Sequence, residues 1–274
     1  MAVLTLTTDF GTRDGYVAAL KGALQQALPG TPIVDLTHDI DPYDRVAGAL
    51  YLYRALRSWP ADAVHLCVVD PGVGSDRSWL AAQFSFGWVV LPDNGLLHYL
   101  VSVEQPRQLR SLSDAWPTGS TTFEARDRIA PALASLAAEG STWVPAHSYR
   151  RLSVPVPVYD VYRSQGHVIH VDRYGSLVTN IERTQLPLYE PEAQAARVKV
   201  FIGNRLVGRL RGSYSDVQRG EPLALFNSDG WLEIACREGN AASFYSASRG
   251  QRIELASEVP LRAVHAPQTT GLIQ

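Results

Sequence analysis

Apolar runs and helical segments alternate along the first half of the chain. Short apolar runs predict strands at Val3–Thr7, Ile33–Leu36, Val64–Val69, Trp79–Phe84 and Trp88–Leu91. Helical composition and spacing predict helices at Tyr16–Leu28, Tyr43–Leu56 and Ile129–Glu139. The run at 64–69 is typical of a strand covered on both faces. This alternation predicts a layered α/β domain with a Rossmann-like sheet over residues 1–152.

The pattern changes near residue 150. The stretch Val154-Pro155-Val156-Pro157-Val158 predicts an extended linker over residues 153–160. Helical signals then nearly vanish. Short β-type runs follow at His167–Val171, Leu177–Ile181, Val198–Ile202, Arg205–Leu210, Leu223–Phe226, Trp231–Cys236 and Gln251–Leu255. They predict a small all-β domain, a sandwich or a barrel, over residues 161–264, with a tail at 265–274.

Composition narrows the class of protein. Of the 274 residues, 46% are hydrophobic and 19% are charged, which excludes a wholly disordered chain. The net charge of -2 argues against a protein built mainly to bind nucleic acid. No apolar run reaches the roughly 18 residues of a membrane span, and the first residues do not resemble a signal peptide. We expect a soluble cytoplasmic protein with no nucleic-acid or membrane partner.

Several common site types have no signature here. Cys67 and Cys236 lie in apolar runs, which predicts buried thiols rather than a disulfide or metal ligands. The seven histidines are scattered, and His38 is expected to be a core or cap residue. Neither a nucleotide-binding glycine fingerprint nor a G-x-S-x-G elbow occurs. No metal site is predicted.

Acidic loops follow three of the predicted strands. They contain Asp9 with Asp14, Thr37-His38-Asp39, and Asp70 with Arg77. Ligands of α/β sheets bind outside the carboxyl ends of strands, so these loops are candidates for a site. Asp9 and Asp14 could hold ribose hydroxyls and an amine, and Asp70 with Arg77 could orient a water or an anion. Aspartate is also common in turns and helix caps, so each loop alone has an ordinary structural explanation.

Short motifs occur in a specific order from residue 5 to about residue 255. In the first half they are Thr8-Asp9-Phe10-Gly11 with Asp14, Tyr16 and Lys21-Gly22; Val34-Asp35-Leu36-Thr37-His38; Asp70-Pro71-Gly72-Val73-Gly74-Ser75 with Arg77; Pro92-Asp93-Asn94-Gly95; and Thr122-Phe123 with Arg126-Asp127. In the second half they are Asp172-Arg173-Tyr174-Gly175; Thr179-Asn180-Ile181; Asn227-Ser228-Asp229-Gly230; and Gly239-Asn240-Ala241. The ordered set resembles the S-adenosyl-L-methionine (SAM) hydroxide adenosyltransferase family of adenosine-forming hydrolases, which is related to fluorinases and chlorinases.

The resemblance implies an N-terminal α/β domain, a C-terminal β-barrel and a homotrimer with sites between subunits. Asp9 would hold both ribose hydroxyls, and Asp14 would face the methionine ammonium. Tyr43 and Phe123 would pack on the ribose and adenine. The C-terminal residues that the resemblance assigns to the substrate are Asp172, Tyr174, Ser176, Ser228, Asp229, Glu233 and Glu238. Ser176 departs from the asparagine usual in the family. Without the motif context, Tyr174 and Trp231 would be expected in the barrel core.

The implied reaction is displacement of methionine from C5′ of SAM by water or hydroxide, with no cofactor. Family hydrolases surround the water with Asp, Arg and His, and Asp70 and Arg77 match two of these. Halogenases have a Tyr at the position of Asp70, and a carboxylate there would repel a halide.

Glu124 stands where the family has histidine. Two carboxylates near one water would raise one pKa, which could improve a base. Glu124 could instead pair with Arg77 and leave Asp70 less restrained. Our hypothesis is that Asp70 is the base and Glu124 orients the water through Arg77. If Glu124 points away, the water site is incomplete. Glu124 therefore keeps a non-catalytic SAM- or adenosine-binding protein as an alternative. The other alternative is a SAM-dependent halogenase, against which the absence of the Tyr and of the halide loop counts.

Overall fold

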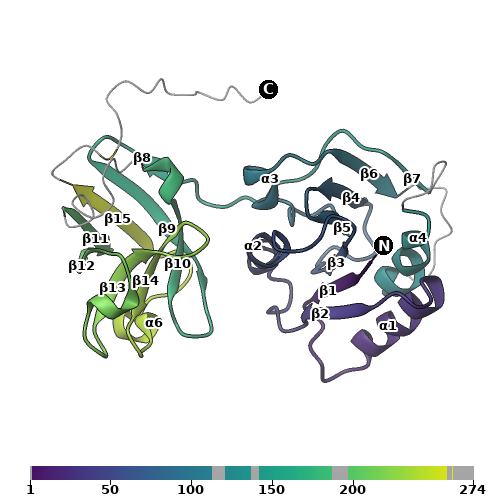
Figure 1. The fold of residues 1–274 in the computed structure, drawn as a ribbon, viewed down its shortest axis with the longest axis horizontal. Helices are drawn as coiled ribbons and strands as arrows, with labels where there is room; N and C mark the ends of the chain where they lie inside the picture. Colours follow the sequence, from purple (N-terminus) through teal and green to yellow (C-terminus); the bar gives the residue numbers. More distant parts are fainter. Residues whose placement is uncertain (1, 113–120, 137–141, 187–196, 258–260, 262–274) are drawn as a thin grey trace. The chain divides into compact units, whose positions relative to one another are not determined.

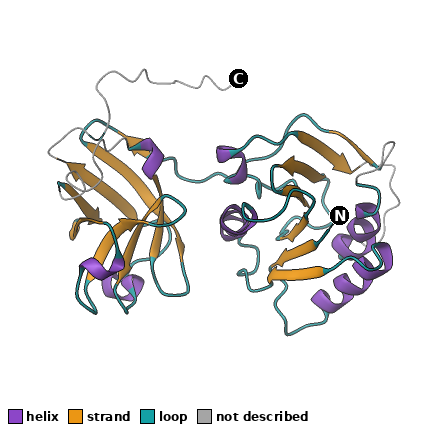
Figure 2. Cartoon of the chain, in the orientation of Figure 1, coloured by secondary structure: helices purple, strands orange, loops and turns teal. Residues whose placement is uncertain are grey.

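The computed structural model describes residues 2–112, 121–136, 142–186, 197–257 and 261. The chain divides into two compact units, Met1–Ser153 and Val154–Gln274, each described here by itself. Helices border the sheet of the N-terminal unit, whereas strands dominate the C-terminal unit (Figure 2). The tail expected at 265–274 lies outside the described residues.

One mixed sheet organises the N-terminal unit (Figure 1). Its strands are β1 (Leu4–Thr8), β2 (Ile33–Thr37), β3 (Val64–Val68), β4 (Trp79–Phe84), β5 (Gly87–Pro92), β6 (Gln108–Leu112) and β7 (Trp143–Pro145), in the order β2-β1-β3-β5-β4-β6-β7. Parallel pairing joins β2 to β1, β1 to β3 and β3 to β5. Antiparallel pairing joins β5 to β4, β4 to β6 and β6 to β7. A domain of strands and helices is confirmed, but the antiparallel strands make it a mixed sheet, and the Rossmann-like layering stays a prediction.

The first two predicted helices of this unit begin and end within two residues of the predicted positions, and α3 (Leu100–Val103) was not predicted. The other helices are α1 (Tyr16–Ala27), α2 (Arg45–Leu56), the π-helix η1 (Ala125–Ile129) and α4 (Ala130–Leu133). α1 buries Leu20 and Leu24, one turn apart, against the sheet. α2 begins two residues later than predicted because Asp44 caps it, its side chain accepting from the Ala47 N–H. The third predicted helix begins earlier, at the π-helical turn, and its predicted residues 137–139 are not described.

The predicted coverage of the third strand on both faces is confirmed, since all five residues of β3 are buried. His65 is tolerated there because its ring hydrogen-bonds the Thr5 hydroxyl at 2.7 Å and the Phe86 carbonyl at 3.1 Å. Burial lowers the pKa of His65 to about 4. The parallel pairing of β1, β3 and β5 places their carboxyl ends at one edge of the sheet.

Seven strands close a barrel in the C-terminal unit. They are β9 (Arg163–Val171), β10 (Leu177–Glu182), β11 (Val198–Ile202), β12 (Arg205–Arg211), β13 (Pro222–Phe226), β14 (Trp231–Cys236) and β15 (Arg252–Ser257), and β8 (Val158–Tyr159) extends β9. The ring runs β10-β14-β13-β12-β11-β15-β9 and closes through β9–β10. Short helices are η2 (Arg183–Gln185), η3 (Tyr214–Asp216) and α6 (Ala241–Tyr245). The barrel is confirmed, and each predicted β run corresponds to one of its strands.

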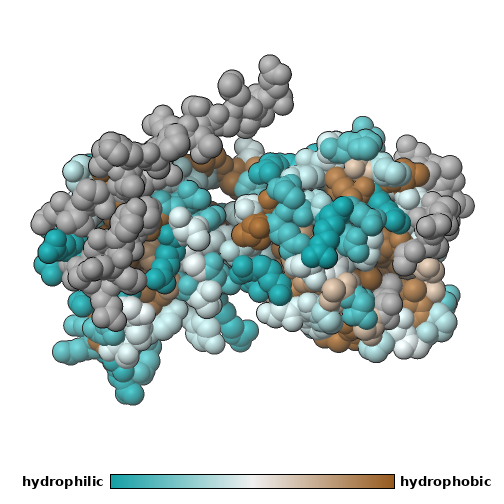
Figure 3. Space-filling view, turned by 45° about the horizontal axis from the view of Figure 1, so that its top comes forward, coloured by the Kyte–Doolittle hydropathy of each residue, from teal (hydrophilic) through white to brown (hydrophobic). Residues whose placement is uncertain are grey.

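Alternate residues of these strands fill the barrel, as in β11, where Val198, Val200 and Ile202 are buried. Cys67 is buried as predicted, but Cys236 is only partly buried; both are free thiols. Hydrophilic and hydrophobic residues intersperse on the visible surface of each unit (Figure 3). Among the described residues no helix is long and apolar enough to cross a membrane.

Candidate active site

A cavity of about 350 Å³ lies where β1 and β3 end in the N-terminal unit. Five residues predicted to form the site line it: Asp9, Tyr43, Asp70, Phe123 and Glu124. The rest of its lining is Phe10, Tyr16, Pro42, Val68, Val73, Trp79, Thr122 and Ala125. Carboxylates therefore face aromatic and aliphatic side chains across one small space, which is the usual make-up of a specific small-molecule pocket.

Arg77 bridges the two carboxylates nearest the end of β3. Its Nε donates to both oxygens of Asp70, at 2.9 and 2.7 Å, and its Nη2 donates to Asp70 and to Glu124. The exposed fractions of the three side chains are only 2% for Arg77, 4% for Asp70 and 8% for Glu124. Burial opposes the charge of Arg77, but its hydrogen bonds to Asp70 and Glu124 raise its pKa. The cluster is thus a preorganised ion-pair network.

Backbone geometry brings this cluster together. Gly74 has a φ of 81°, and a Cβ at that position would lie 2.9 Å from the carbonyl oxygen of Thr121. The loop after β3 can therefore approach the segment before η1 closely only with glycine at this position. The Asn94 side chain donates to the Val69 carbonyl at 2.9 Å and to Asp70 at 3.4 Å, which fixes the same loop from β5.

Glu124 points into this network rather than away from it. Its Oε2 accepts from Arg77 and from the indole Nε1 of Trp79, at 3.2 Å. Its Oε1 lies 3.7 Å from Nη1 of Arg128. The alternative in which Glu124 faces away is therefore wrong. Arg77 itself is not among the described residues that line the cavity. It therefore orients the two carboxylates without lining the cavity itself.

Asp9 and Tyr43 contact each other elsewhere in the cavity lining. The Tyr43 N–H donates to Asp9 Oδ2 at 2.9 Å, and Tyr43 has a φ of 69°, a conformation rare for a bulky residue. The Tyr43 side chain is 70% exposed. Burial is the main cause that raises the pKa of Asp9, and the charge of Asp70 adds to it.

Three aromatic rings form one wall of the cavity. Phe10, Tyr16 and Phe123 have centroids 5.6 to 5.9 Å apart in tilted and edge-to-face pairs. Such a wall suits a flat, partly apolar ligand.

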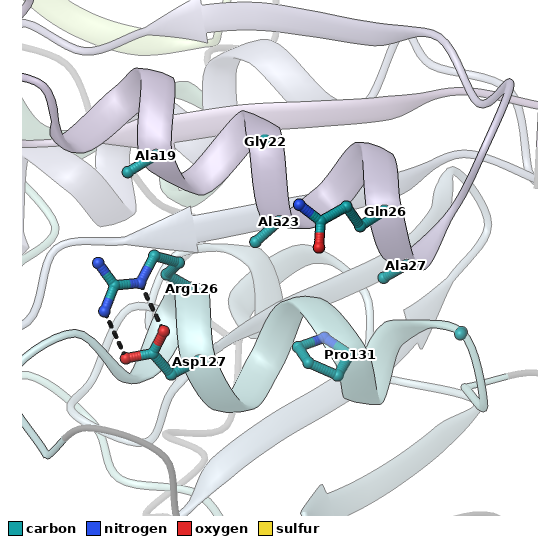
Figure 4. Close-up of a pocket in the computed structure, with 9 residues that line it drawn as sticks. Ala19, Gly22, Ala23, Gln26, Ala27, Arg126, Asp127 and Pro131 are labelled. Atoms are coloured by element: carbon teal, nitrogen blue, oxygen red, sulfur yellow. Dashed lines mark hydrogen bonds and ion pairs between the residues drawn. The ribbon is translucent and has the colours of Figure 1, made fainter.

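Asp14 is exposed and is not among the described lining residues. Arg126 and Asp127 belong to a second hollow, of about 660 Å³, between α1 and the η1–α4 segment (Figure 4). There they pair with each other at 2.7 Å, beside Ala19, Gly22 and Ala23. Within the motif that contains Phe123, the first residues thus line the cavity, and Arg126 and Asp127 line the second hollow.

His38 does not reach the cavity lining. Its ring bonds the Thr8 hydroxyl at 2.8 Å and lies 3.1 Å from Asp35, which Lys21 also contacts. The prediction that His38 is a buried core residue is confirmed, with Nδ1 hydrogen-bonded to Thr8.

In the C-terminal unit, Asp172, Tyr174 and Ser176 share one turn between β9 and β10. Asp172 Oδ1 accepts from the N–H groups of Tyr174 and Ser176, at 2.9 and 2.8 Å. Ser176 is buried, whereas Tyr174 is 79% exposed. Tyr174 therefore lies outside the barrel core, where it would be expected without the motif context, whereas Trp231 is buried.

The remaining predicted residues of this unit lie in the β13–β14 turn, on β14 and just after β14. Ser228 is exposed in the β13–β14 turn, and Asp229 donates its N–H to the Asn227 side chain. Glu233 is buried and accepts from Tyr214 and Asn227, at 2.8 and 3.1 Å. Glu238 is exposed and pairs with Arg219 at 2.9 Å.

Sequence reasoning missed Trp79 and Arg128 as partners of Glu124. Trp79 was assigned only to a strand. Arg128 stands four residues after Glu124, the spacing of an ion pair on a helix, and this was the available signal.

The fold and cavity define an α/β protein with a C-terminal β-barrel and an acidic pocket at the carboxyl ends of parallel strands. Residues 4–143 match the SAM hydroxide adenosyltransferase N-terminal domain, and residues 166–254 match the C-terminal domain of that family. The chain belongs to the SAM hydroxide adenosyltransferase family.

Named relatives agree with this assignment. A Thermus thermophilus protein named (R)-S-adenosyl-L-methionine hydrolase is 33% identical, covering 90% of this chain and 97% of its own length. A hydrolase of the same name from Methanocaldococcus jannaschii is 29% identical over 92% and 95%. A fluorinase from an Actinoplanes species is 24% identical over 90% and 95%. A crystal structure of an uncharacterized Thermotoga maritima protein has a TM-score of 0.82 and 30% identity, covering 93% of this chain and all of that one.

Proposed function

We propose that this chain hydrolyses SAM to adenosine and L-methionine. Family membership and the hydrolase relatives support this activity. The observation that carries the proposal is the pair of carboxylates, Asp70 and Glu124, that line one cavity and share the Arg77 guanidinium. Such a pair can orient a water molecule and accept its proton.

In the proposed reaction, a water oxygen attacks C5′ as the C5′–S bond breaks, and the bonding electron pair leaves with sulfur. Methionine departs as a neutral thioether, so the leaving group needs neither a general acid nor a cofactor. Asp70 takes the water proton and later releases it to solvent. Arg77 and Glu124 contribute to catalysis by aligning the water with the C5′–S bond. General-base catalysis typically raises a reaction rate by about 10²- to 10⁴-fold.

The other lining residues would bind the substrate. Asp9 would accept hydrogen bonds from both ribose hydroxyls, and Tyr43 and Phe123 would pack on the ribose and adenine. Asp14 would face the ammonium group. In this scheme the carboxyl ends of β1 and β3 serve as the binding edge, as in a layered Rossmann-like domain.

The C-terminal unit would complete the site from a neighbouring subunit of a homotrimer in the cytoplasm. Tyr174 would stack on adenine with its exposed ring, and Asp172 would reach the amino acid. Ser228 and Asp229 would bind the methionine carboxylate. The adenine edge would be lined by Glu233 and the residues around Glu238. Ser176 would offer a polar contact to the substrate at the position where the family usually has asparagine. Light scattering of the purified chain, with a mass of three subunits expected, tests the trimer.

The negative charge of the cavity favours hydrolysis over halogenation. Asp9, Asp70 and Glu124 place three carboxylates on the cavity. They attract the sulfonium and ammonium groups of SAM and repel a chloride or fluoride ion. The fluorinases among the relatives are also less identical to this chain than the Thermus hydrolase.

A product assay tests the proposal. Purified protein is incubated with SAM in buffer containing chloride or fluoride, and nucleosides and methionine are quantified by chromatography against a protein-free control. Equal amounts of adenosine and methionine are expected. A 5′-halogenated nucleoside would show a halogenase. SAM that stays intact while bound in calorimetry would show a binding protein.

A further inference from the structure

The substitution of glutamate at position 124 brings a second negative charge beside Asp70. Both carboxylates contact the same guanidinium, that of Arg77, and all three side chains are at least nine-tenths buried. One buried cation between two buried anions leaves one negative charge uncompensated, which is costly away from water. A second cation is therefore required if both carboxylates stay ionised.

Arg128 is placed to supply that cation. Its Nη1 lies 3.7 Å from Glu124 Oε1, while Arg77 and Trp79 contact Oε2, so each oxygen of Glu124 has its own partner. The Arg128 side chain is 15% exposed. Its Nε is buried and has no hydrogen-bond partner in the part of the chain that the structure describes. A guanidinium in this setting depends on the nearby carboxylate for its stability.

The local backbone explains how Arg128 reaches Glu124. Glu124 precedes the π-helix η1, and Arg128 lies inside it. A π-helical turn is a rare, locally widened helix that is frequent at functional sites. Here it presents Arg128 to Glu124 from the side away from Arg77, since the two cations contact different oxygens.

We propose that Arg128 is a positioning residue for SAM cleavage whose charge compensates that of Glu124, so that Arg77 remains bound to Asp70. The inference rests on the proposed function and deepens it. Arg128 is absent from the described lining of the cavity, so it acts through Glu124 rather than on the substrate. The charged groups around Glu124 are Arg128 on η1 and Arg77 before β4, which also binds Asp70 after β3. Asp9 after β1 is close enough to Asp70 for the two charges to interact.

Removal of the Arg128 charge should disturb the cluster in a pH-dependent way. In Arg128→Met, Asp70 and Glu124 share one guanidinium, and one of them holds a proton to a higher pH. The acidic limb of the kcat/KM profile should move up by about one pH unit, and kcat at neutral pH should fall about tenfold. Arg128→Lys keeps the charge and should restore most of the rate. Arg107→Met is a matched control, because Arg107 pairs with Glu104 on the surface, at 4.0 Å.

A double variant tests the route of the effect. Glu124→Gln removes the charge that Arg128 neutralises, so adding Arg128→Met to it should change kcat less than threefold and leave the acidic limb in place. A wild-type profile in Arg128→Met, or a further large loss in the double variant, would overturn the role of Arg128. The double comparison holds even if Arg128→Met alone does not fold. If the wild-type chain cleaves no SAM, the proposed function fails and the inference with it.

Discussion

The two units hold their candidate residues in different ways. In the N-terminal unit, Asp9, Asp70 and Glu124 line one cavity, and Arg77 locks two of them in place. In the C-terminal unit, the candidates lie on separate turns and strands, some exposed and some, like Glu233, bonded to neighbours. A site whose groups already face one cavity can perform chemistry, whereas groups on separate turns and strands contribute binding energy when a ligand contacts them.

This contrast predicts a division of kinetic effects. Changes in the N-terminal cluster should lower kcat, because they alter groups that act on the reacting atoms. Changes at exposed C-terminal positions should raise KM and leave kcat nearly unchanged, because they remove uniform binding.

The largest effect is expected at Asp70. Asp70→Asn removes the proposed base while keeping the size of the side chain, and kcat should fall by about 10²- to 10⁴-fold. Initial rates of adenosine formation measure this loss. Asp76→Asn, on the same loop but exposed, is the control and should keep the wild-type rate. A kcat within twofold of wild type in Asp70→Asn would exclude Asp70 as the base.

The next effect is expected at Asp9. Asp9→Asn replaces charge-assisted hydrogen bonds to the ribose, each worth about 1.5–3 kcal/mol, so kcat/KM should fall by about 10- to 150-fold. Asp39→Asn, an exposed aspartate after β2, is the control. Equal kcat/KM values in both variants would contradict contact between Asp9 and the ribose.

The pH dependence of KM gives a second test of the contact between Asp9 and the ribose. Burial raises its pKa above the usual range of an aspartate, so KM should rise as pH falls through this raised value. A carboxyl with a raised folded-state pKa contributes less to stability as pH increases through that window. Asp9→Asn can still accept from the Tyr43 N–H and should therefore melt no lower than wild type at neutral pH. A lower melting temperature would contradict this interpretation.

A smaller effect is expected at Tyr174. Loss of an aromatic stack is worth about 0.5–1.5 kcal/mol, so KM should rise about two- to tenfold in Tyr174→Ala with kcat unchanged. Tyr162→Ala provides a matched change at another exposed tyrosine of the same unit. If kcat falls instead of KM rising, the division between the units is wrong.

The smallest effect on activity is expected at Glu233. Its carboxylate is occupied by Tyr214 and Asn227, so Glu233→Gln should lower the free energy of unfolding by about 1 kcal/mol and leave kcat unchanged. Urea denaturation measures the first quantity. A fall in kcat would contradict this placement, since Glu233 is proposed to line the adenine edge and not to act on the reacting atoms.

Much of the fold was predictable because its strands are strongly patterned. The seven β runs of the C-terminal half became the barrel, since alternating burial determines a strand locally. β6, with the sequence Gln108–Leu112, was missed because its residues are mostly polar and only Leu112 is buried. The early start of the helical segment at η1 was missed because a π-helical turn has no simple sequence period.

The residues of the candidate site were predictable one by one, but most of the contacts between them were not. Motif order identified Asp9, Asp70 and Glu124, and the cavity unites them. The bond from Trp79 to Glu124 joins positions 45 residues apart, and only the folded sheet brings them together. The contact between Glu124 and Arg77, by contrast, was one of the possibilities raised by the sequence, and the structure shows Arg77 bound to both Glu124 and Asp70.

Oxygen-18-labelled water tests the central claim most directly. The wild-type chain is incubated with SAM in labelled water, and the products are analysed by mass spectrometry, with Asp70→Asn in parallel. Attack at C5′ predicts one labelled oxygen in adenosine, unlabelled methionine and little product from the variant. Unlabelled adenosine, or equal turnover by the variant, would contradict water activation at the Asp70–Arg77–Glu124 cluster.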